Sequence, residues 1–194
     1  GGARTFRPNS TLSEERTMTT RRTMLELGLA AGAVTLAGAA AGNAQSGMNA
    51  KDGRARDAIN KVLDDWHAAA AAADEARYFG HLTSTSLFMG TDATERWTKE
   101  EFQAYAHPFF AKGKAWSFTP VRRSIGLGPG PTTAWFEEDL ATPNLGPSRG
   151  SGVMLLEGKV WRIEQYNLSV PIPNDVFDEV KKLIAAHLAK PKSD

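Results

Sequence analysis

The stretch Phe88-Met-Gly-Thr-Asp-Ala-Thr-Glu-Arg-Trp97 carries the most structural information in this chain of 194 residues. It overlaps Leu82–Met89, which reads as a loop that enters a short strand. Gly90-Thr91-Asp92 has the composition of a turn, in which Asp commonly hydrogen-bonds to its own backbone. We therefore interpret Asp92 as a structural turn residue, and Glu95 and Arg96 as local ion-pair partners above the packed tryptophan ring.

Helices are expected on both sides of this stretch. Residues 54–73 repeat apolar side chains at helical spacing, with charged side chains on the other face. A short second helix is expected over residues 74–80, and Gly80 ends it. Thr98-Lys-Glu-Glu101 has the spacing of a capping box and starts a third helix, which Pro108 is expected to bend or end.

Beyond Lys114 the apolar period changes from helical to two residues. Four strands are expected, joined by turns rich in Gly, Pro and Asn, at residues 116–125, 132–140, 148–157 and 160–170. Helices followed by such a meander indicate an α+β domain with an antiparallel sheet, and not alternating βαβ units. Residues 174–190 follow a Pro-Ile-Pro break and predict a C-terminal amphipathic helix.

Several of these segments together resemble a SnoaL-like domain of the nuclear transport factor 2-like superfamily. The resemblance is carried by Gly90–Asp92, Glu95–Trp97, Tyr105–Trp116, Trp135-Phe136, Arg149–Gly152 and Gln165–Ser169. It places one domain at residues 54–173 and implies a cone-shaped fold, in which a strongly bent antiparallel sheet packs on the N-terminal helices. It does not name a reaction, because this fold hosts isomerases, cyclases, dehydratases and proteins without catalysis.

The first third of the chain has a different character. Thr20-Arg-Arg-Thr-Met-Leu25 precedes an apolar run at Leu27–Gly42 that is rich in Ala and Gly. Residues 18–44 resemble a twin-arginine signal peptide with a cleavage site near Ala44, so we expect an exported protein, periplasmic or extracellular. A membrane anchor is the alternative, but the run is shorter and less apolar than the roughly 20 residues that a spanning helix needs.

Two shorter segments flank this signal. Residues 1–17 show no apolar periodicity and precede Met18, so we interpret them as a non-native or mis-started extension ahead of the true start. Residues 45–53 are interpreted as a linker to the domain. We expect the mature chain to keep no stable membrane anchor after cleavage.

Composition argues against several classes of function. Removing residues 1–50 takes away five of the 23 basic and three of the 22 acidic side chains, which leaves a formal charge near −1. No basic stripe for nucleic acid remains. The chain has no Cys, and therefore no disulfide, thiolate metal site or cysteine nucleophile. Its four histidines are scattered without a ligand spacing, so we expect neither a metal site nor a cofactor.

The last strand predicts which side chains face the interior of the cone. Strict alternation puts Trp161, Ile163, Gln165 and Asn167 on one face, which we assign to the interior because two amides then lie beside large rings. The same choice elsewhere gives a ligand-lining set of Trp66, Tyr105, Phe109, Trp116, Phe118, Trp135, Glu137, Gln165 and Asn167. Such a lining suits a small apolar or aromatic ligand. The alternative is that the rings only form a core.

The opposite sheet face would then carry Phe136, Tyr166, Leu168 and Val170 toward water. An apolar patch of this kind usually marks a partner surface. The resemblance also implies pairing through the outer sheet face. We therefore expect a homodimer.

Glu137 is the candidate general base. It shares the predicted interior face with a tryptophan, where burial favours the neutral carboxyl and raises its proton affinity. The alternative is a solvated rim, on which Glu137 pairs with Arg122, Arg123 or Arg149. An isomerase mechanism of the ketosteroid type also needs a tyrosine inside the first helix, and this helix offers Trp66 instead.

Three hypotheses of function follow. The first is an exported SnoaL-like domain that binds a small, largely apolar molecule in a cone-shaped pocket, with catalysis unassigned. The second is an enzyme of the isomerase, cyclase or dehydratase type with Glu137 as general base. The third is a non-catalytic dimerisation module whose core is filled by its own side chains.

Overall fold

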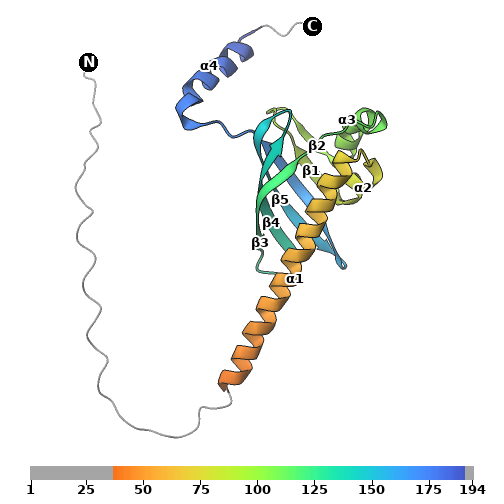
Figure 1. The fold of residues 1–194 in the computed structure, drawn as a ribbon, viewed down its shortest axis with the longest axis vertical. Helices are drawn as coiled ribbons and strands as arrows, with labels where there is room; N and C mark the ends of the chain where they lie inside the picture. Colours follow the sequence, from red (N-terminus) through yellow and green to blue (C-terminus); the bar gives the residue numbers. More distant parts are fainter. Residues whose placement is uncertain (1–36, 191–194) are drawn as a thin grey trace, which may run out of the picture.

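The computed structural model describes residues 37–190, with side chains described from residue 50 onward. The predicted extension and most of the predicted signal lie outside the described residues. The described elements, in chain order (Figure 1), are α1 (Ala37–Ala71), α2 (Glu75–Gly80), β1 (Leu82–Met89), β2 (Arg96–Thr98), α3 (Lys99–Ala111), β3 (Thr119–Leu127), β4 (Thr133–Thr142), β5 (Gly146–Glu157), β6 (Val160–Ser169), a 3-10 turn (Asn174–Val176) and α4 (Phe177–Leu188).

Six strands form one curved sheet in the order β2-β1-β6-β5-β4-β3. The strands of the predicted meander, β3 to β6, pair antiparallel with their neighbours, as expected. The prediction of a wholly antiparallel sheet is wrong for one pair of strands, because β1 runs parallel to β6. The helix α1 lies along one face of the sheet, and α2 and α3 lie beside β1 (Figure 1). The predicted cone-shaped α+β fold is confirmed.

The hydrophobic core lies between α1 and the sheet. Trp66 of α1 stacks on Tyr78 of α2 with ring centroids 5.0 Å apart, and it meets Tyr166 of β6 edge-on at 4.7 Å. All three rings are buried. Burying an apolar side chain of this size stabilises a fold by about 1.5–3 kcal/mol, and aromatic contacts add to this. This cluster therefore holds two helices and the last strand of the sheet together.

The start of α1 differs from the sequence prediction. The helix begins at Ala37 and continues through residues 45–53, which the sequence assigned to a linker. Apolar periodicity gave no signal for the residues just before Arg54, because the side chains at residues 50–53 are exposed or only partly buried. None of the helices in the described part of the chain combines the length and the apolarity needed to cross a bilayer.

The third helix confirms the predicted capping box. Thr98 Oγ1 accepts a hydrogen bond from the amide of Glu101 at 3.3 Å, and Glu101 Oε2 accepts one from the amide of Thr98 at 2.8 Å. The bond from the Thr98 amide lowers the pKa of Glu101. The helix does not end at Pro108 but runs to Ala111. Proline removes one hydrogen bond, and here it does so on an exposed side near the last turn, where water can satisfy the free carbonyl.

A β-bulge in β6 changes the side-chain alternation on which the predicted interior depends. Gln165 pairs with Val153 and Ile163 pairs with Met154, so Glu164 is an extra residue without a partner on β5. An extra residue moves every later side chain of the strand to the opposite face. The faces of β6 are therefore exchanged at Glu164.

The predicted interior face is right before the bulge and wrong after it. Trp161 is buried as predicted. Beyond the bulge the buried residues are Tyr166 and Leu168, which were expected outside, while Gln165 and Asn167 are only partly buried. The predicted outer apolar patch is therefore corrected, because its largest rings belong to the core.

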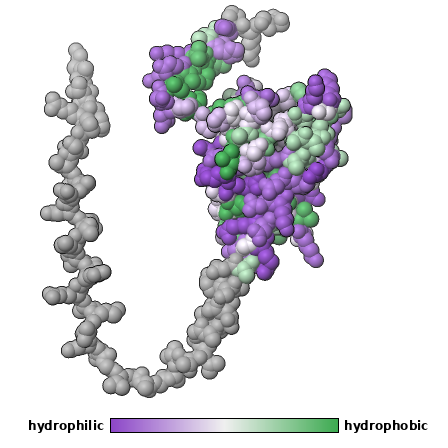
Figure 2. Space-filling model, in the orientation of Figure 1, coloured by the Kyte–Doolittle hydropathy of each residue, from purple (hydrophilic) through white to green (hydrophobic). Residues whose placement is uncertain are grey.

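The C-terminal helix is amphipathic, as predicted, but it buries none of its residues. Its exposed apolar side chains are Phe177, Leu183, Ile184 and Leu188. Figure 2 shows hydrophobic colour gathered on this helix at the top of the view, apart from the main body. The helix therefore contributes no packed side chain to the core.

Candidate functional site

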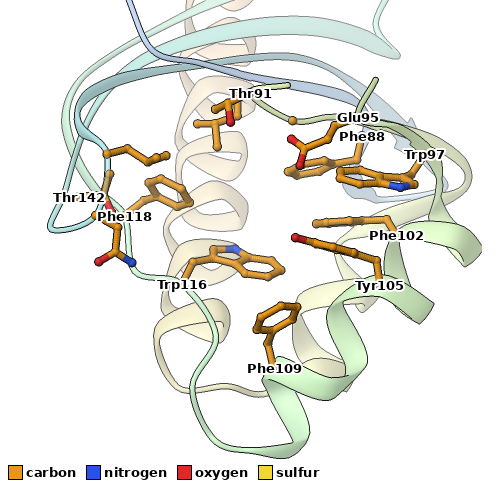
Figure 3. A pocket seen from close by; sticks show the side chains of 14 residues that line it. Phe88, Thr91, Glu95, Trp97, Phe102, Tyr105, Phe109, Trp116, Phe118 and Thr142 are labelled. Carbon is orange, nitrogen blue, oxygen red and sulfur yellow. The ribbon is translucent and has the colours of Figure 1, made fainter. Parts of the chain in front are cut away.

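A cavity of about 260 Å³ lies at the end of the cone where α3 packs against β1. Seven rings from β1, β2, α3 and the segment before β3 line it (Figure 3), namely Phe88, Trp97, Phe102, Tyr105, Phe109, Trp116 and Phe118. Tyr105 and Phe109 are 47% and 43% exposed, so the cavity opens to solvent along α3. We call this space the aromatic cavity.

Packing between the rings fixes the walls of the aromatic cavity. Phe88 of β1 stacks on Phe102 of α3 with centroids 3.8 Å apart. Trp97 of β2 stacks on Tyr105 of α3 at 4.9 Å. Each pair joins a strand to the helix, so the rings hold each other in position without a ligand. Largely pre-formed, apolar concave sites of this kind are typical of small-molecule binding.

The rest of the lining is small, neutral or apolar, with one exception. It comes from β6, from the end of β4 and from the β1–β2 and β4–β5 turns, and comprises Gly90, Thr91, Glu95, Thr142, Asn144, Leu145 and Leu168. Glu95 is the one charged residue among them. The two turns meet at the same end of the sheet, although about 50 residues separate them in the sequence.

The β1–β2 turn positions Glu95. Asp92 accepts hydrogen bonds at Oδ1 from the amide and the hydroxyl of Thr94, at 2.8 and 2.6 Å, and these bonds lower its pKa. The amide of Asp92 donates to Glu95 Oε2 at 3.1 Å. The structural role predicted for Asp92 is therefore confirmed. The predicted local ion pairing is wrong, because Arg96 instead contacts the sulfur of Met89 at 3.5 Å.

Four of the predicted ligand-lining residues reach the aromatic cavity, and these are Tyr105, Phe109, Trp116 and Phe118. Tyr105 and Phe109 are four residues apart and share one stripe of α3. Trp116 and Phe118 alternate in the extended segment before β3. Trp66 of α1 was also predicted to line the cavity. It is buried in the core instead and does not reach the cavity.

The remaining predicted residues lie on the opposite sheet face, which is a correction. Gln165 pairs with Val153, and Val153 pairs with Trp135, so one row crosses β6, β5 and β4. The bulge turns this row outward, and Trp135 is 53% exposed. Asn167 and Glu137 belong to the next outward row. Residues paired across neighbouring strands face the same side of the sheet. The wrong face predicted for Gln165 and Asn167 in β6 therefore corresponds to the wrong face predicted for Trp135 and Glu137 in β4.

Sequence reasoning missed Phe88, Glu95, Trp97 and Phe102 as cavity residues. Phe102 lies on the same helical stripe as Tyr105, so the spacing contained a signal for it. Phe88, Glu95 and Trp97 lie in the most informative stretch of the sequence, but local patterns do not show that this stretch folds over α3. Only the packing of β1 and β2 against that helix brings them together.

The candidate base Glu137 is half exposed on the outer face. Its carboxylate lies 3.7 Å from Arg122 Nη1. Arg122 Nε also donates to Asp139 at 2.9 Å, and this bond lowers the pKa of Asp139. The arrangement is the solvated, paired rim that was the alternative to a catalytic Glu137.

The neighbouring residue Glu138 is the carboxylate that faces the interior, and its side chain is fully buried. One oxygen lies 2.7 Å from His67 Nε2, and the other accepts from Arg123 Nε at 2.9 Å. Arg123 also donates to Asp64 at 2.8 Å. Phe118 lies between this network and the aromatic cavity. It lines the cavity, and its ring packs edge-on against His67 with the ring centroids 6.2 Å apart. Glu138 therefore has a basic partner at each oxygen.

A second hollow of about 470 Å³ lies between the middle of α1 and the β3–β4 turn. Its lining mixes the charged residues Lys51, Asp52 and Arg56 with a single aromatic ring, Trp161. We regard the smaller aromatic cavity as the better candidate, because its apolar wall matches a ligand site more closely. Within the described residues, no three His, Asp or Glu side chains are grouped to hold a metal ion.

Comparison with known protein families identifies one match. The model of the SnoaL-like domain family matches residues 59–173, which is more than half of the chain. These residues contain the whole aromatic cavity. Among curated proteins the sequence has no significant match.

Solved structures share the fold. An NTF2-like protein of unknown function from Pseudomonas putida is 11% identical, with a TM-score of 0.52 over 63% of this chain and 91% of its own. A candidate scytalone dehydratase from Novosphingobium aromaticivorans is 7% identical, with a TM-score of 0.56 over 64% and 89%. A candidate aromatic ring hydroxylase from the same organism is 14% identical, with a TM-score of 0.51 over 61% and 90%. Identities this low establish the fold and not an activity.

Proposed function

Because the chain belongs to the SnoaL-like domain family, we propose that it binds a small, largely apolar or aromatic molecule in the aromatic cavity. The observation that carries this proposal is the wall of seven rings around about 260 Å³ of space. This volume is just below the range of about 300–1,000 Å³ that is typical for drug-sized ligands. A ligand of one or two rings therefore fits best.

The cavity favours this function over the two other hypotheses. A dimerisation module whose core is filled by its own side chains would have no open cavity. Here the partly exposed rings of Tyr105 and Phe109 border an open space. An enzyme with Glu137 as base needs that carboxylate inside, whereas it lies on the outer face beside Arg122. Glu138 does face inward, but Arg123 and His67 occupy both of its oxygens. Binding without assigned catalysis is the function that the geometry supports.

The replacement Tyr105→Ala is expected to weaken binding of 2-phenylethanol, a neutral one-ring probe, by about tenfold, because one face of the ligand loses its apolar contact. Isothermal titration calorimetry of the full chain measures this change. Trp135→Ala is the matched control, since this tryptophan is also about half exposed but lies on the outer sheet face. Equal losses in the two variants, or a loss only in the control, contradict the proposed site.

We further propose that the protein is exported through a twin-arginine signal at residues 18–44. The motif around Arg21 and Arg22 supports this, although it lies outside the described residues. Cleavage near Ala44 is compatible with the fold, because Ile59 is the first buried residue among the described side chains of α1. The mature chain then keeps every helical residue that packs in the described core.

We also propose a homodimer through the outer sheet face, in the corrected assignment of that face. Trp135, Val153, Leu155, Leu87 and Met89 are the apolar side chains of its paired rows. Trp135 is exposed on this face, and exposed tryptophans are the kind of anchor that interfaces use.

Native mass spectrometry of the protein purified from its natural compartment tests export and pairing together. We expect particles of two chains, each of which begins near residue 45 and carries no peptide from residues 1–17. Retention of the N-terminal residues contradicts export. A mass of one chain at micromolar concentration contradicts the dimer.

A further inference from the structure

The aromatic cavity is lined by a single charged side chain, and that side chain is acidic. Among the fourteen lining residues, Glu95 is acidic and none is Lys, Arg or His. The other polar side chains in the lining are uncharged: those of Thr91, Thr142 and Asn144, the hydroxyl of Tyr105 and the indole N–H groups of the two tryptophans. A ligand that fills the cavity therefore meets one carboxylate and no basic side chain of the wall.

The Glu95 carboxylate belongs to the cavity wall, and its one hydrogen bond among the described residues is to the backbone of its own turn. In Figure 3 its oxygens point into the space beside Phe88. Oε2 accepts the Asp92 amide, and a Cβ on Gly90 would collide with the same oxygen, so the turn holds the carboxylate close to the wall. None of the ion pairs found among the described residues includes Glu95. No Lys, Arg or His in the described part of the chain therefore forms an ion pair with this carboxylate.

The aromatic rings add to the attraction for a positive charge. Each ring carries partial negative charge on its faces, and a cation near such a face is stabilised. Trp97 and Tyr105 stand opposite Trp116 and Phe118 across the cavity in Figure 3. A carboxylate set among several ring faces is the chemical arrangement that recognises ammonium groups on an apolar body.

We propose that the ligand of the aromatic cavity is an organic cation, with an apolar or aromatic body and an ammonium group placed beside Glu95. This inference rests on the proposed function, because it requires that the cavity bind a small molecule. An anionic ligand would meet the Glu95 charge without any basic partner. A neutral ligand would displace water from the carboxylate and return at most an uncharged hydrogen-bond donor, so the negative charge would stay without a counter-charge in the cavity. Of these three kinds of ligand, the cation is the one that both contacts the rings and balances the charge of the carboxylate.

Three probes of nearly equal size and different charge test the proposal. Phenethylammonium is the cation, 2-phenylethanol the neutral analogue and phenylacetate the anion. Each is titrated calorimetrically into the full chain at neutral pH. The ammonium is expected to bind about tenfold more tightly than the alcohol, since the ring faces and the carboxylate both contribute, and phenylacetate is expected to bind most weakly.

Two variants assign the preference to its source. Glu95→Gln keeps an oxygen that can accept the Asp92 amide but removes the charge, so it is expected to abolish most of the difference between the ammonium and the alcohol. Glu137→Gln removes a carboxylate on the outer face and is expected to leave all three affinities unchanged. The two variants change the net charge of the protein equally, so a difference between them cannot come from net charge alone.

The outcomes separate this proposal from the function on which it rests. Equal affinities for ammonium and alcohol overturn the cation proposal and leave an aromatic-binding function intact. An ammonium preference that survives Glu95→Gln also overturns it. Failure of all three probes to bind overturns both.

Discussion

Replacing Glu138 by alanine is expected to lower the free energy of unfolding by about 3–5 kcal/mol, the usual cost of breaking a buried ion pair. The substitution leaves the Arg123 guanidinium, whose side chain is 9% exposed, without its buried acceptor. It also removes the carboxylate beside His67 Nε2. Urea unfolding measures the change as a lower midpoint with an unchanged slope.

The adjacent Asp139→Ala is the matched control. Asp139 lies on the same strand with its side chain on the opposite, solvated face, where it pairs with Arg122 and Arg149. Exposed pairs contribute little, so we expect a loss below about 1 kcal/mol. Similar losses for Glu138→Ala and Asp139→Ala would falsify the assignment of Glu138 as the buried member of the β4 acidic run.

The second large effect is expected at Gly152, where alanine should cost about 1–3 kcal/mol or more through overpacking. A Cβ at this buried position would collide with the backbone oxygen of Gln165 and lie 2.8 Å from Phe136 Cε1. Gln165 directly follows the bulge residue Glu164, so its carbonyl cannot move without disturbing the pairing of β5 with β6. Thermal and urea unfolding both report this loss.

Gly126→Ala provides a control with the same chemical change. Its Cβ would meet the ring of Trp135, but that ring is exposed and can swing into solvent. A glycine inside a strand is itself unfavourable, so this variant is expected to stay within about 1 kcal/mol of the parent protein. A large loss for Gly126→Ala with none for Gly152→Ala contradicts the packing described for the two faces.

Most elements of the fold were predictable because their signals are local. The capping box of Thr98 and Glu101 acts over three residues, and its two hydrogen bonds are those expected. The change of apolar period after Lys114 located the four strands of the meander to within a few residues. The prediction that Pro108 bends or ends the third helix is wrong for the helix end, because the effect of a proline depends on whether the lost hydrogen bond faces water.

The candidate site was predictable only where it comes from single elements. Tyr105 and Phe109 follow from the spacing of one helix, and Trp116 and Phe118 from one extended segment. Glu95 and Trp97 could not be placed, because their position depends on how β1 and β2 pack against α3. Gln165 and Asn167 were placed on the wrong face, because alternation was assumed to continue through Glu164.

The sequence by itself therefore determined most of the elements, their order and the family, since caps, turns and side-chain periods arise among residues close together in the chain. It did not predict the short strand β2, whose pairing with β1 belongs to the tertiary structure. The tertiary structure decided which sheet face is the interior. Its source is the bulge at Glu164, whose carboxylate accepts hydrogen bonds from the hydroxyls of Thr83 and Thr85, about 80 residues earlier. The alternation of side chains between the two faces of a strand is a local rule. An inserted residue, held in place by a strand far away in the sequence, exchanges the two faces for every residue after it.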